Sequence, residues 1–106
     1  MKKEIMGFLD FIFGAKKRQV ETYLNNGAVI LDVRSQREWD SGHIENAIHI
    51  PIDDLINRVD EIKSLNKPVI ACCASGVRSA KAAKFLNLNN IEATNGGGWV
   101  NLKKQL

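Results

Sequence analysis

Short apolar runs rich in β-branched residues alternate along this chain with stretches of helical periodicity. The runs cover residues 28–33, 47–50 and 68–72, and residues 91–94 are expected to form a fourth before Gly96–Gly98 breaks the chain. Strands that are buried on both faces read as continuous apolar runs. The alternation therefore predicts an α/β fold with a mostly parallel sheet, in which sites form beyond the carboxyl ends of the strands.

The segments between these runs carry helical signals. Ser35 and Glu38 have the spacing of a capping box, which predicts a brief helix that ends near Gly42. Residues 99–106 are expected to add a last helical turn or two, and Asn26-Gly27 to end the first helix of the domain. Three longer helical faces are indicated by Val20, Tyr23 and Leu24; by Leu55, Val59 and Ile62; and by Ser79, Ala82, Ala83 and Leu86.

The apolar segment of residues 5–13 is too short to cross a bilayer and lacks the small-residue cleavage site of a secretory signal. Its apolar residues fall at i, i+3, i+4 and i+7, which predicts a short amphipathic helix packed on the domain or on a neighbour. The residues of this stripe are Ile5, Phe8, Leu9 and Ile12. A chain of 106 residues is long enough for one compact domain. We therefore expect an N-terminal helix over residues 1–14, a single domain over residues 15–106, and a cytoplasmic protein.

The net charge and the positions of the cysteines and histidines limit the partners and cofactors that we expect for this chain. The net charge of +3 favours small anions or acidic partners. The basic residues are scattered without interleaved aromatic residues, so we expect no nucleic-acid partner. The shortness of the apolar segment of residues 5–13 leads us to expect no membrane partner either. Cys72 and Cys73 are neighbours that point to opposite faces of a strand, so they are poorly placed to bridge each other or to share a metal ion. His43 and His49 lack the spacing of metal ligands, and no metal or other cofactor is expected.

The segment CCASGVRSAKAAKFL, residues 72–86, carries the strongest chemical signal. A strand delivers the thiol of Cys73 to a short turn at Gly76, and a helix is expected to begin around Arg78 or Ser79. Backbone N–H groups of the turn and of the helix start would converge on the sulfur and stabilise a thiolate. The helix dipole and Arg78 would lower the pKa of the thiol further, which makes Cys73 a candidate nucleophile.

Three motifs, in order along the chain, resemble those of the rhodanese family. Residues 31–51, LDVRSQREWDSGHIENAIHIP, look like its first signature: LDVR, E-W/Y, GHI and a final IP. Residues 73–86 are similar to its cysteine loop, C-x-x-G-x-R-S followed by A-A and Leu, and residues 95–99, NGGGW, resemble its terminal G-G…W element. The resemblance implies a rhodanese-like domain with a sheet of four to five strands and helices on both faces. The family's first short strand, expected before the helix around Val20, is not evident.

The resemblance also implies a reaction. The Cys73 thiolate would take the outer sulfur of an anionic donor such as thiosulfate or a persulfide, and a thiol or protein would accept that sulfur from the cysteine persulfide. The anion would be bound by the loop residues Ala74, Ser75, Gly76, Val77, Arg78 and Ser79. Charged groups inside a domain need partners, so the polar residues of the first signature are interpreted as a scaffold for the neighbouring loops. These are Asp32, Arg34, Glu38 and His43.

Two other interpretations remain open. Cys72 and Arg78 satisfy C-x5-R, the loop of cysteine-dependent phosphatases and some arsenate reductases. A glycine in the fourth position of a loop that begins at Cys73, with RSxxAA after it, favours the shorter rhodanese loop. The domain could instead be mainly a persulfide carrier or binding module for a partner protein, because Ala74 and Val77 add no cation beside the nucleophile.

Overall fold

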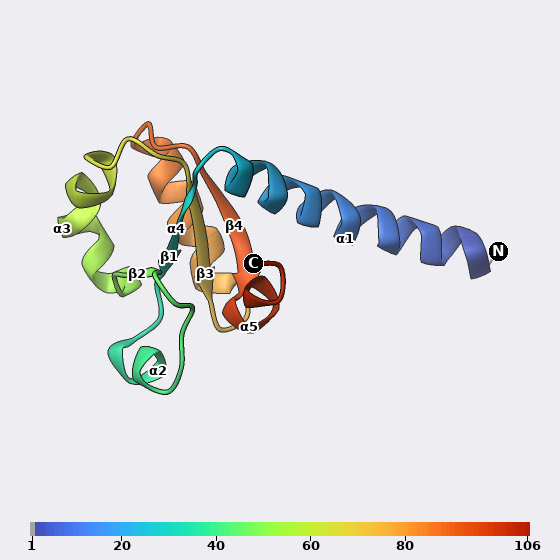
Figure 1. Ribbon diagram of the computed structural model, residues 1–106, viewed down its shortest axis with the longest axis horizontal. Helices are drawn as coiled ribbons and strands as arrows, with labels where there is room; N and C mark the ends of the chain where they lie inside the picture. The colour runs from blue at the N-terminus through green and yellow to red at the C-terminus, as the bar shows by residue number, and fades with distance from the viewer. Residues whose placement is uncertain (1) are drawn as a thin grey trace.

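The four strands form one parallel sheet with the order β2-β1-β3-β4 (Figure 1). The computed structural model describes residues 2–106, with side chains from residue 14 onward. In chain order the elements are α1 (Lys2–Asn25), β1 (Val29–Asp32), α2 (Gln36–Asp40), β2 (Ile48–His49), α3 (Ile52–Lys63), β3 (Val69–Cys73), α4 (Val77–Leu88), β4 (Ala93–Gly98) and α5 (Trp99–Lys103). The predicted α/β fold with a parallel sheet is confirmed, as is the capping box of Ser35 and Glu38 at the start of α2.

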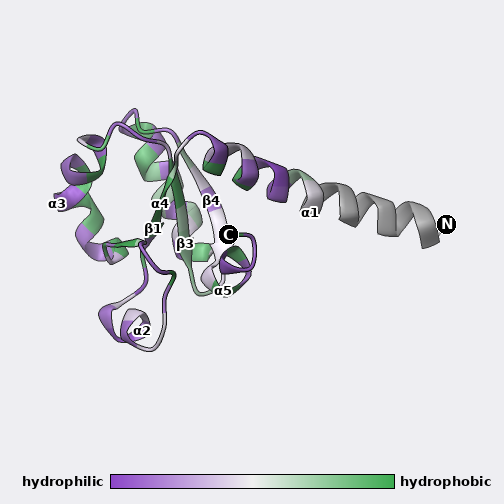
Figure 2. Cartoon of the chain, viewed as in Figure 1, coloured by the Kyte–Doolittle hydropathy of each residue, from purple (hydrophilic) through white to green (hydrophobic). Residues whose placement is uncertain are grey.

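Helices cover both faces of the sheet, and each face has its own core. The cluster on the α3 and α4 side includes Leu31, Val33, Ile50, Leu55, Ile62, Val69, Ala71, Cys73, Ala82, Ala83 and Leu86. The cluster on the α1 and α5 side consists of Val20, Ile44, Ile70, Cys72 and Leu102. Every residue of β3 is buried, as expected for a central strand that is covered on both sides, and Figure 2 shows β3 as largely hydrophobic. The alternation of side chains along β3 therefore separates the two cysteines.

The N-terminal helix is continuous. We expected a short helix before residue 14 and a second one after it, but α1 runs without interruption from Lys2 to Asn25. Residues 2–28 contain no strand, and no described helix is both long and apolar enough to cross a membrane. The predicted apolar stripe of residues 5–12 lies outside the residues whose side chains the structure describes. Its packing, the domain division at residue 14 and the cytoplasmic location stay predictions.

The end of α1 is fixed by glycine. Gly27 has a φ of +79°, and its N–H donates to the carbonyl of Leu24 over 3.0 Å. The N–H of Ala28 donates to the carbonyl of Tyr23 over 3.0 Å. This pair of bonds is the Schellman motif, which ends a helix at a residue with left-handed φ. The stop predicted at Asn26-Gly27 is confirmed, and it turns the chain into β1.

β4 differs from its prediction. We expected a strand over residues 91–94 and a break at the glycines, but the strand continues to Gly98. The pairing of β3 with β4 slips by one residue at Gly96, which is a β-bulge. A Cβ on Gly96 would lie 2.6 Å from the Ile70 side chain, and one on Gly98 would lie 2.7 Å from the Ala74 carbonyl oxygen. Glycine is required here because β4 approaches β3 and the following loop closely, so the prediction of a break was wrong.

Candidate active site

Cys73 is the last residue of β3, at the carboxyl edge of the sheet. Residues 74–76 lead directly into α4, which begins at Val77. Gly76 precedes the helix with a φ of +100°, and a Cβ there would lie 3.2 Å from the backbone of β4, so the turn suits glycine. The Cys73 residue is buried, with 1% of its surface exposed, whereas Ser75 and Val77 are exposed. The sulfur therefore lies at the bottom of a short exposed loop.

Three donors converge on the Cys73 sulfur. The N–H of Gly76 donates to Sγ over 3.0 Å and the N–H of Ser79 over 3.4 Å, while the Ser79 hydroxyl oxygen lies 3.3 Å away. Burial raises the pKa of the Cys73 thiol, but hydrogen bonds from Ser79, Gly76 and Ser75 outweigh burial, so the pKa lies below its ordinary value. The nest of N–H groups expected from the sequence surrounds this sulfur, and it favours the thiolate.

The neighbouring thiol has the opposite environment. Cys72 is fully buried on the α1 and α5 side of the sheet, in the cluster that contains Val20 and Leu102. Burial, reinforced by the Asp32 carboxylate, raises the pKa of Cys72 to about 12. A phosphatase-type loop that starts at Cys72 would need this sulfur on the same side as the start of α4, but Cys72 packs on the other face.

Arg78 is engaged by a carboxylate rather than left free beside the thiol. Its two terminal nitrogens donate to the two carboxylate oxygens of Glu38 over 2.7 and 2.9 Å. Glu38 lies in α2 and Arg78 in α4, so this bidentate pair joins the first signature to the cysteine loop. The positive charge that we expected from Arg78 at the anion site is therefore largely compensated.

A buried ion pair between Arg34 and Asp32 lies beside the α2 segment. Nε and Nη2 of Arg34 donate to the Asp32 carboxylate at distances down to 2.7 Å, and neither side chain is more than 3% exposed. Arg34 also donates to the carbonyl oxygens of Glu38, over 3.2 Å, and Gly42, over 2.7 Å. Its guanidinium carbon lies 4.6 Å from the centroid of the Trp99 ring, a cation–π contact. The predicted polar scaffold is confirmed for these residues: Arg34 holds the backbone of α2, and Arg78 holds a side chain of α2.

Both histidines stack on Trp39. The ring centroids of His43 and His49 lie 3.7 and 4.6 Å from that of Trp39. Nδ1 of His43 lies 2.9 Å from the Trp39 carbonyl oxygen, and Nε2 of His49 lies 2.8 Å from that of Arg34. His43 therefore belongs to the scaffold as predicted, and His49 joins it. Among the described side chains, no three of the His, Cys, Asp or Glu type are grouped so that they could hold a metal ion.

Sequence reasoning missed Asn95. Its Oδ1 lies 2.7 Å from Ser79 Oγ and accepts from the N–H of Gly97 over 2.9 Å. Its Nδ2 donates to the carbonyl oxygen of Gly76 over 2.9 Å. The NGGGW motif drew attention to its glycines. The signal available for Asn95 was a polar side chain directly after the strand expected over residues 91–94 and directly before three glycines.

The comparison with known proteins agrees with these motifs. Residues 16–105 match the family described as the Rhodanese-like domain. The chain belongs to this family. Thiosulfate sulfurtransferase GlpE of Pseudomonas syringae pv. syringae (strain B728a) is 31% identical to this rhodanese-like domain over 85 residues, which cover 74% of the chain and 76% of GlpE. The crystal structure of a rhodanese-like domain protein from Staphylococcus aureus is 37% identical, with a TM-score of 0.61 and coverage of 72% of this chain and 74% of that one.

Other relatives are longer than the part that matches. YqhL, an uncharacterised protein of Bacillus subtilis (strain 168), is 42% identical over 62 residues, 58% of this chain and 48% of YqhL. A tRNA sulfurtransferase of Thermoplasma acidophilum is 35% identical over 66 residues, and a tRNA uridine(34) hydroxylase of Cronobacter sakazakii is 31% identical over 85 residues. These matches cover 62% and 73% of the rhodanese-like chain, but only 13% and 24% of the relatives. The relatives support a sulfur-transfer family.

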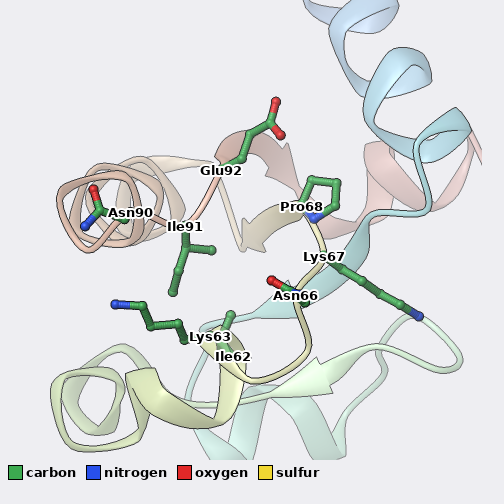
Figure 3. A pocket seen from close by; sticks show the side chains of 8 residues that line it. All are labelled: Ile62, Lys63, Asn66, Lys67, Pro68, Asn90, Ile91 and Glu92. Carbon is green, nitrogen blue, oxygen red and sulfur yellow. The ribbon is translucent and has the colours of Figure 1, made fainter.

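An open pocket of about 280 Å³ lies at the opposite edge of the sheet from Cys73. Pro68 and Glu92, which directly precede β3 and β4, are part of its wall, so it opens at the amino ends of these strands. Lys67 and Glu92 point away from its centre (Figure 3). The pocket is therefore no part of the cysteine site of this rhodanese-like domain. Its full lining is Ile62, Lys63, Asn66, Lys67, Pro68, Asn90, Ile91 and Glu92.

Acid is expected to weaken the link between α2 and α4. The hydrogen bond from Arg78 is the main reason why the pKa of Glu38 is lowered from 4.5 to about 2. A carboxyl with a depressed folded pKa contributes stability above its unfolded pKa, and this stability is lost as the pH falls through the folded value. Calorimetric melting between about pH 4.5 and pH 2 should therefore show a steeper loss for the wild type than for Glu38→Gln.

Glu61→Gln is the matched control for this prediction. Glu61 accepts two hydrogen bonds from Arg58, over 2.7 and 3.0 Å, but the two side chains are 57% and 42% exposed. Water screens an exposed pair, so Glu61→Gln should follow the wild-type acid profile more closely than Glu38→Gln does. Equal profiles for the wild type and Glu38→Gln would contradict the prediction.

Proposed function

We propose that this rhodanese-like domain is a sulfurtransferase that carries a sulfane sulfur as a persulfide on Cys73. The observation that carries the proposal is the convergence of the Gly76 N–H, the Ser79 N–H and the Ser79 hydroxyl on Sγ. Donors in this arrangement favour the thiolate, which is the nucleophilic form of cysteine. The burial of Cys72 and its pKa of about 12 support the same choice of nucleophile.

The reaction has two half-reactions. In the first, the Cys73 thiolate attacks the outer sulfur of a donor such as thiosulfate, the S–S bond of the donor breaks, and its electron pair leaves with sulfite. In the second, a thiolate or cyanide attacks the transferred sulfur, the bond to Sγ breaks, and its electron pair returns to Sγ. Between the two steps the outer persulfide sulfur carries the negative charge. We propose that it is held by the loop residues Ala74, Ser75, Gly76, Val77, Arg78 and Ser79.

No proton has to be removed from the sulfur donor in this scheme. We therefore assign His43 no part in the chemistry. Its Nδ1 lies 2.9 Å from the carbonyl oxygen of Trp39, and the ring stacks on the indole of the same residue. Both contacts support a role in holding α2. No metal ion or organic cofactor enters either half-reaction.

The loop also supports a second candidate function, persulfide carriage for a partner protein. Ala74, Ser75 and Val77 are exposed and uncharged, and Glu38 compensates the charge of Arg78. Thiosulfate is a dianion, and such a loop offers it little charge complementarity. A persulfide on a thiol or on a protein requires less positive charge from the loop than thiosulfate does. Loading rates with thiosulfate and with glutathione persulfide separate the candidates, because a carrier is expected to load faster from the persulfide.

The direct test is mass spectrometry of the intact protein. Incubation with thiosulfate or a low-molecular-weight persulfide is expected to add the mass of one sulfur atom, and cyanide or excess thiol is expected to remove it. Peptide mapping should place the sulfur on Cys73. Sulfur on Cys72, or no uptake from any sulfane donor, would count against the proposed function.

A further inference from the structure

The Asn95 side chain contacts Gly76 and Ser79, two residues that donate to the Cys73 sulfur. Its Nδ2 donates to the Gly76 carbonyl oxygen over 2.9 Å, and its Oδ1 lies 2.7 Å from Ser79 Oγ. Gly76 and Ser79 in turn supply the donors to Sγ, at 3.0 to 3.4 Å. Asn95 lies in β4, so a single amide ties the edge strand to the turn at Gly76 and to the first turn of α4.

Two backbone groups fix the orientation of this amide. Oδ1 accepts from the N–H of Gly97, and Nδ2 donates to the carbonyl of Gly76. If the amide were turned over, two donors would meet at Gly97 and two acceptors at Gly76. Oδ1 must therefore face Ser79. The Ser79 hydroxyl donates to Oδ1 when the Cys73 sulfur carries no negative charge.

The Ser79 hydroxyl has one proton and two acceptors within reach. Oγ lies 2.7 Å from Asn95 Oδ1 and 3.3 Å from Cys73 Sγ. When Sγ carries a negative charge, the Ser79 hydroxyl proton turns toward the sulfur, while the N–H of Gly97 still donates to Oδ1 of Asn95. Without Asn95, a serine in the first turn of a helix can donate instead to the carbonyl four residues back, which would take the hydroxyl away from the sulfur.

We propose that Asn95 is a positioning residue for sulfur transfer, which holds the Ser79 hydroxyl and the Gly76 turn against the Cys73 sulfur. The inference rests on the proposed function of Cys73. When the acceptor takes the sulfur, its electron pair forms a bond to the outer sulfur, the S–S bond breaks, and the electron pair of that bond stays on Sγ. The charge that forms on Sγ is met by the Ser79 O–H, which rotates without losing its proton.

The test compares Asn95→Ala with Asn87→Ala. Asn87 binds Ala93 through a similar pair of amide hydrogen bonds, over 3.1 and 2.9 Å, near the far end of α4. The pH dependence of iodoacetamide alkylation reports the pKa of Cys73, and cyanide discharge of the preloaded persulfide reports the second half-reaction. We expect Asn95→Ala to raise this pKa by roughly one unit and to slow discharge about tenfold. Asn87→Ala should lower the melting midpoint and leave both values at those of the wild type.

Ser79→Ala decides whether Asn95 acts through the hydroxyl. Adding Asn95→Ala to Ser79→Ala is expected to raise the pKa of Cys73 by less than Asn95→Ala does in the wild type, because coupled residues are not additive, and the remaining shift reports the Gly76 turn. Should Asn95→Ala fail to fold, Asn95→Asp keeps the side-chain shape and is expected to raise the pKa less in the Ser79→Ala background than in the wild type. Additive effects of the two substitutions, wild-type values for the Asn95 variant, or equal shifts in Asn87→Ala would overturn the inference. Alkylation needs no sulfur donor, so a protein that takes up no sulfur refutes only the proposed function.

Discussion

Cys73→Ser is expected to take up no sulfur from any sulfane donor, whereas Cys72→Ser keeps most of the wild-type uptake. A hydroxyl cannot form a persulfide, and it is not ionised near neutral pH. Cys72 packs on the other face of the sheet, and its pKa of about 12 leaves almost no thiolate at neutral pH. Intact-mass measurement after incubation with thiosulfate or a persulfide, followed by cyanide discharge, compares the two variants directly.

Cys72→Ser should still change stability. The substitution places a hydroxyl in an apolar cluster, which costs about 1–3 kcal/mol where the hydroxyl finds no hydrogen-bond partner. Its melting midpoint is therefore expected to fall even though sulfur uptake continues. A phosphatase that uses Cys72 and Arg78 would give the reverse pattern, with Cys72→Ser inactive and the wild type hydrolysing an aryl phosphate. That result would mean that the loop begins one residue earlier than we propose.

The parts of the fold that the sequence predicted are those with strong local signals. The buried strand that ends at Cys73, the capping box of Ser35 and the stop at Gly27 each depend on residues close together in the chain. The predicted division into two helices at residue 14 was wrong, because the glycine there lowers helix stability by only about 1 kcal/mol and does not by itself end a helix. Gly96 misled the strand prediction, because a bulge and a close approach between strands leave the same local pattern as a turn.

The candidate site also has contacts that the local sequence predicts and contacts that it does not. The donors from Gly76 and Ser79 could be predicted because a strand, a glycine turn and a helix start bring nearby N–H groups to one point. The partners from other segments could not. Glu38 is 40 positions from Arg78, and Asn95 is 16 positions from Ser79, so their contacts depend on how α2 and β4 pack against the cysteine loop. These distant partners compensate the arginine charge and accept a hydrogen bond from the serine hydroxyl, and no pattern of neighbouring residues indicates either contact.

Arg34→Met is expected to destabilise the domain by about 3–5 kcal/mol. The substitution leaves the fully buried Asp32 carboxylate without its cation, and an uncompensated buried charge is costly. It also removes the donors to the carbonyls of Glu38 and Gly42, so the backbone of α2 and of the turn after it loses two hydrogen bonds. Urea unfolding at neutral pH measures the loss, which is a large fraction of the stability of an ordinary domain.

Two companion variants separate the buried charge from the arginine itself. Asp32→Asn combined with Arg34→Met removes both charges, so the pair is expected to be less destabilised than Arg34→Met alone. Arg58→Met removes an arginine from an exposed pair and should unfold close to the wild-type urea concentration. If Arg34→Met unfolded at the same urea concentration as Arg58→Met, the buried pair of Asp32 and Arg34 would not stabilise the domain as we expect. Arg34 is linked to the cysteine loop through α2 and the Glu38 pair, so its loss should lower stability more than it changes the alkylation profile of the folded Cys73.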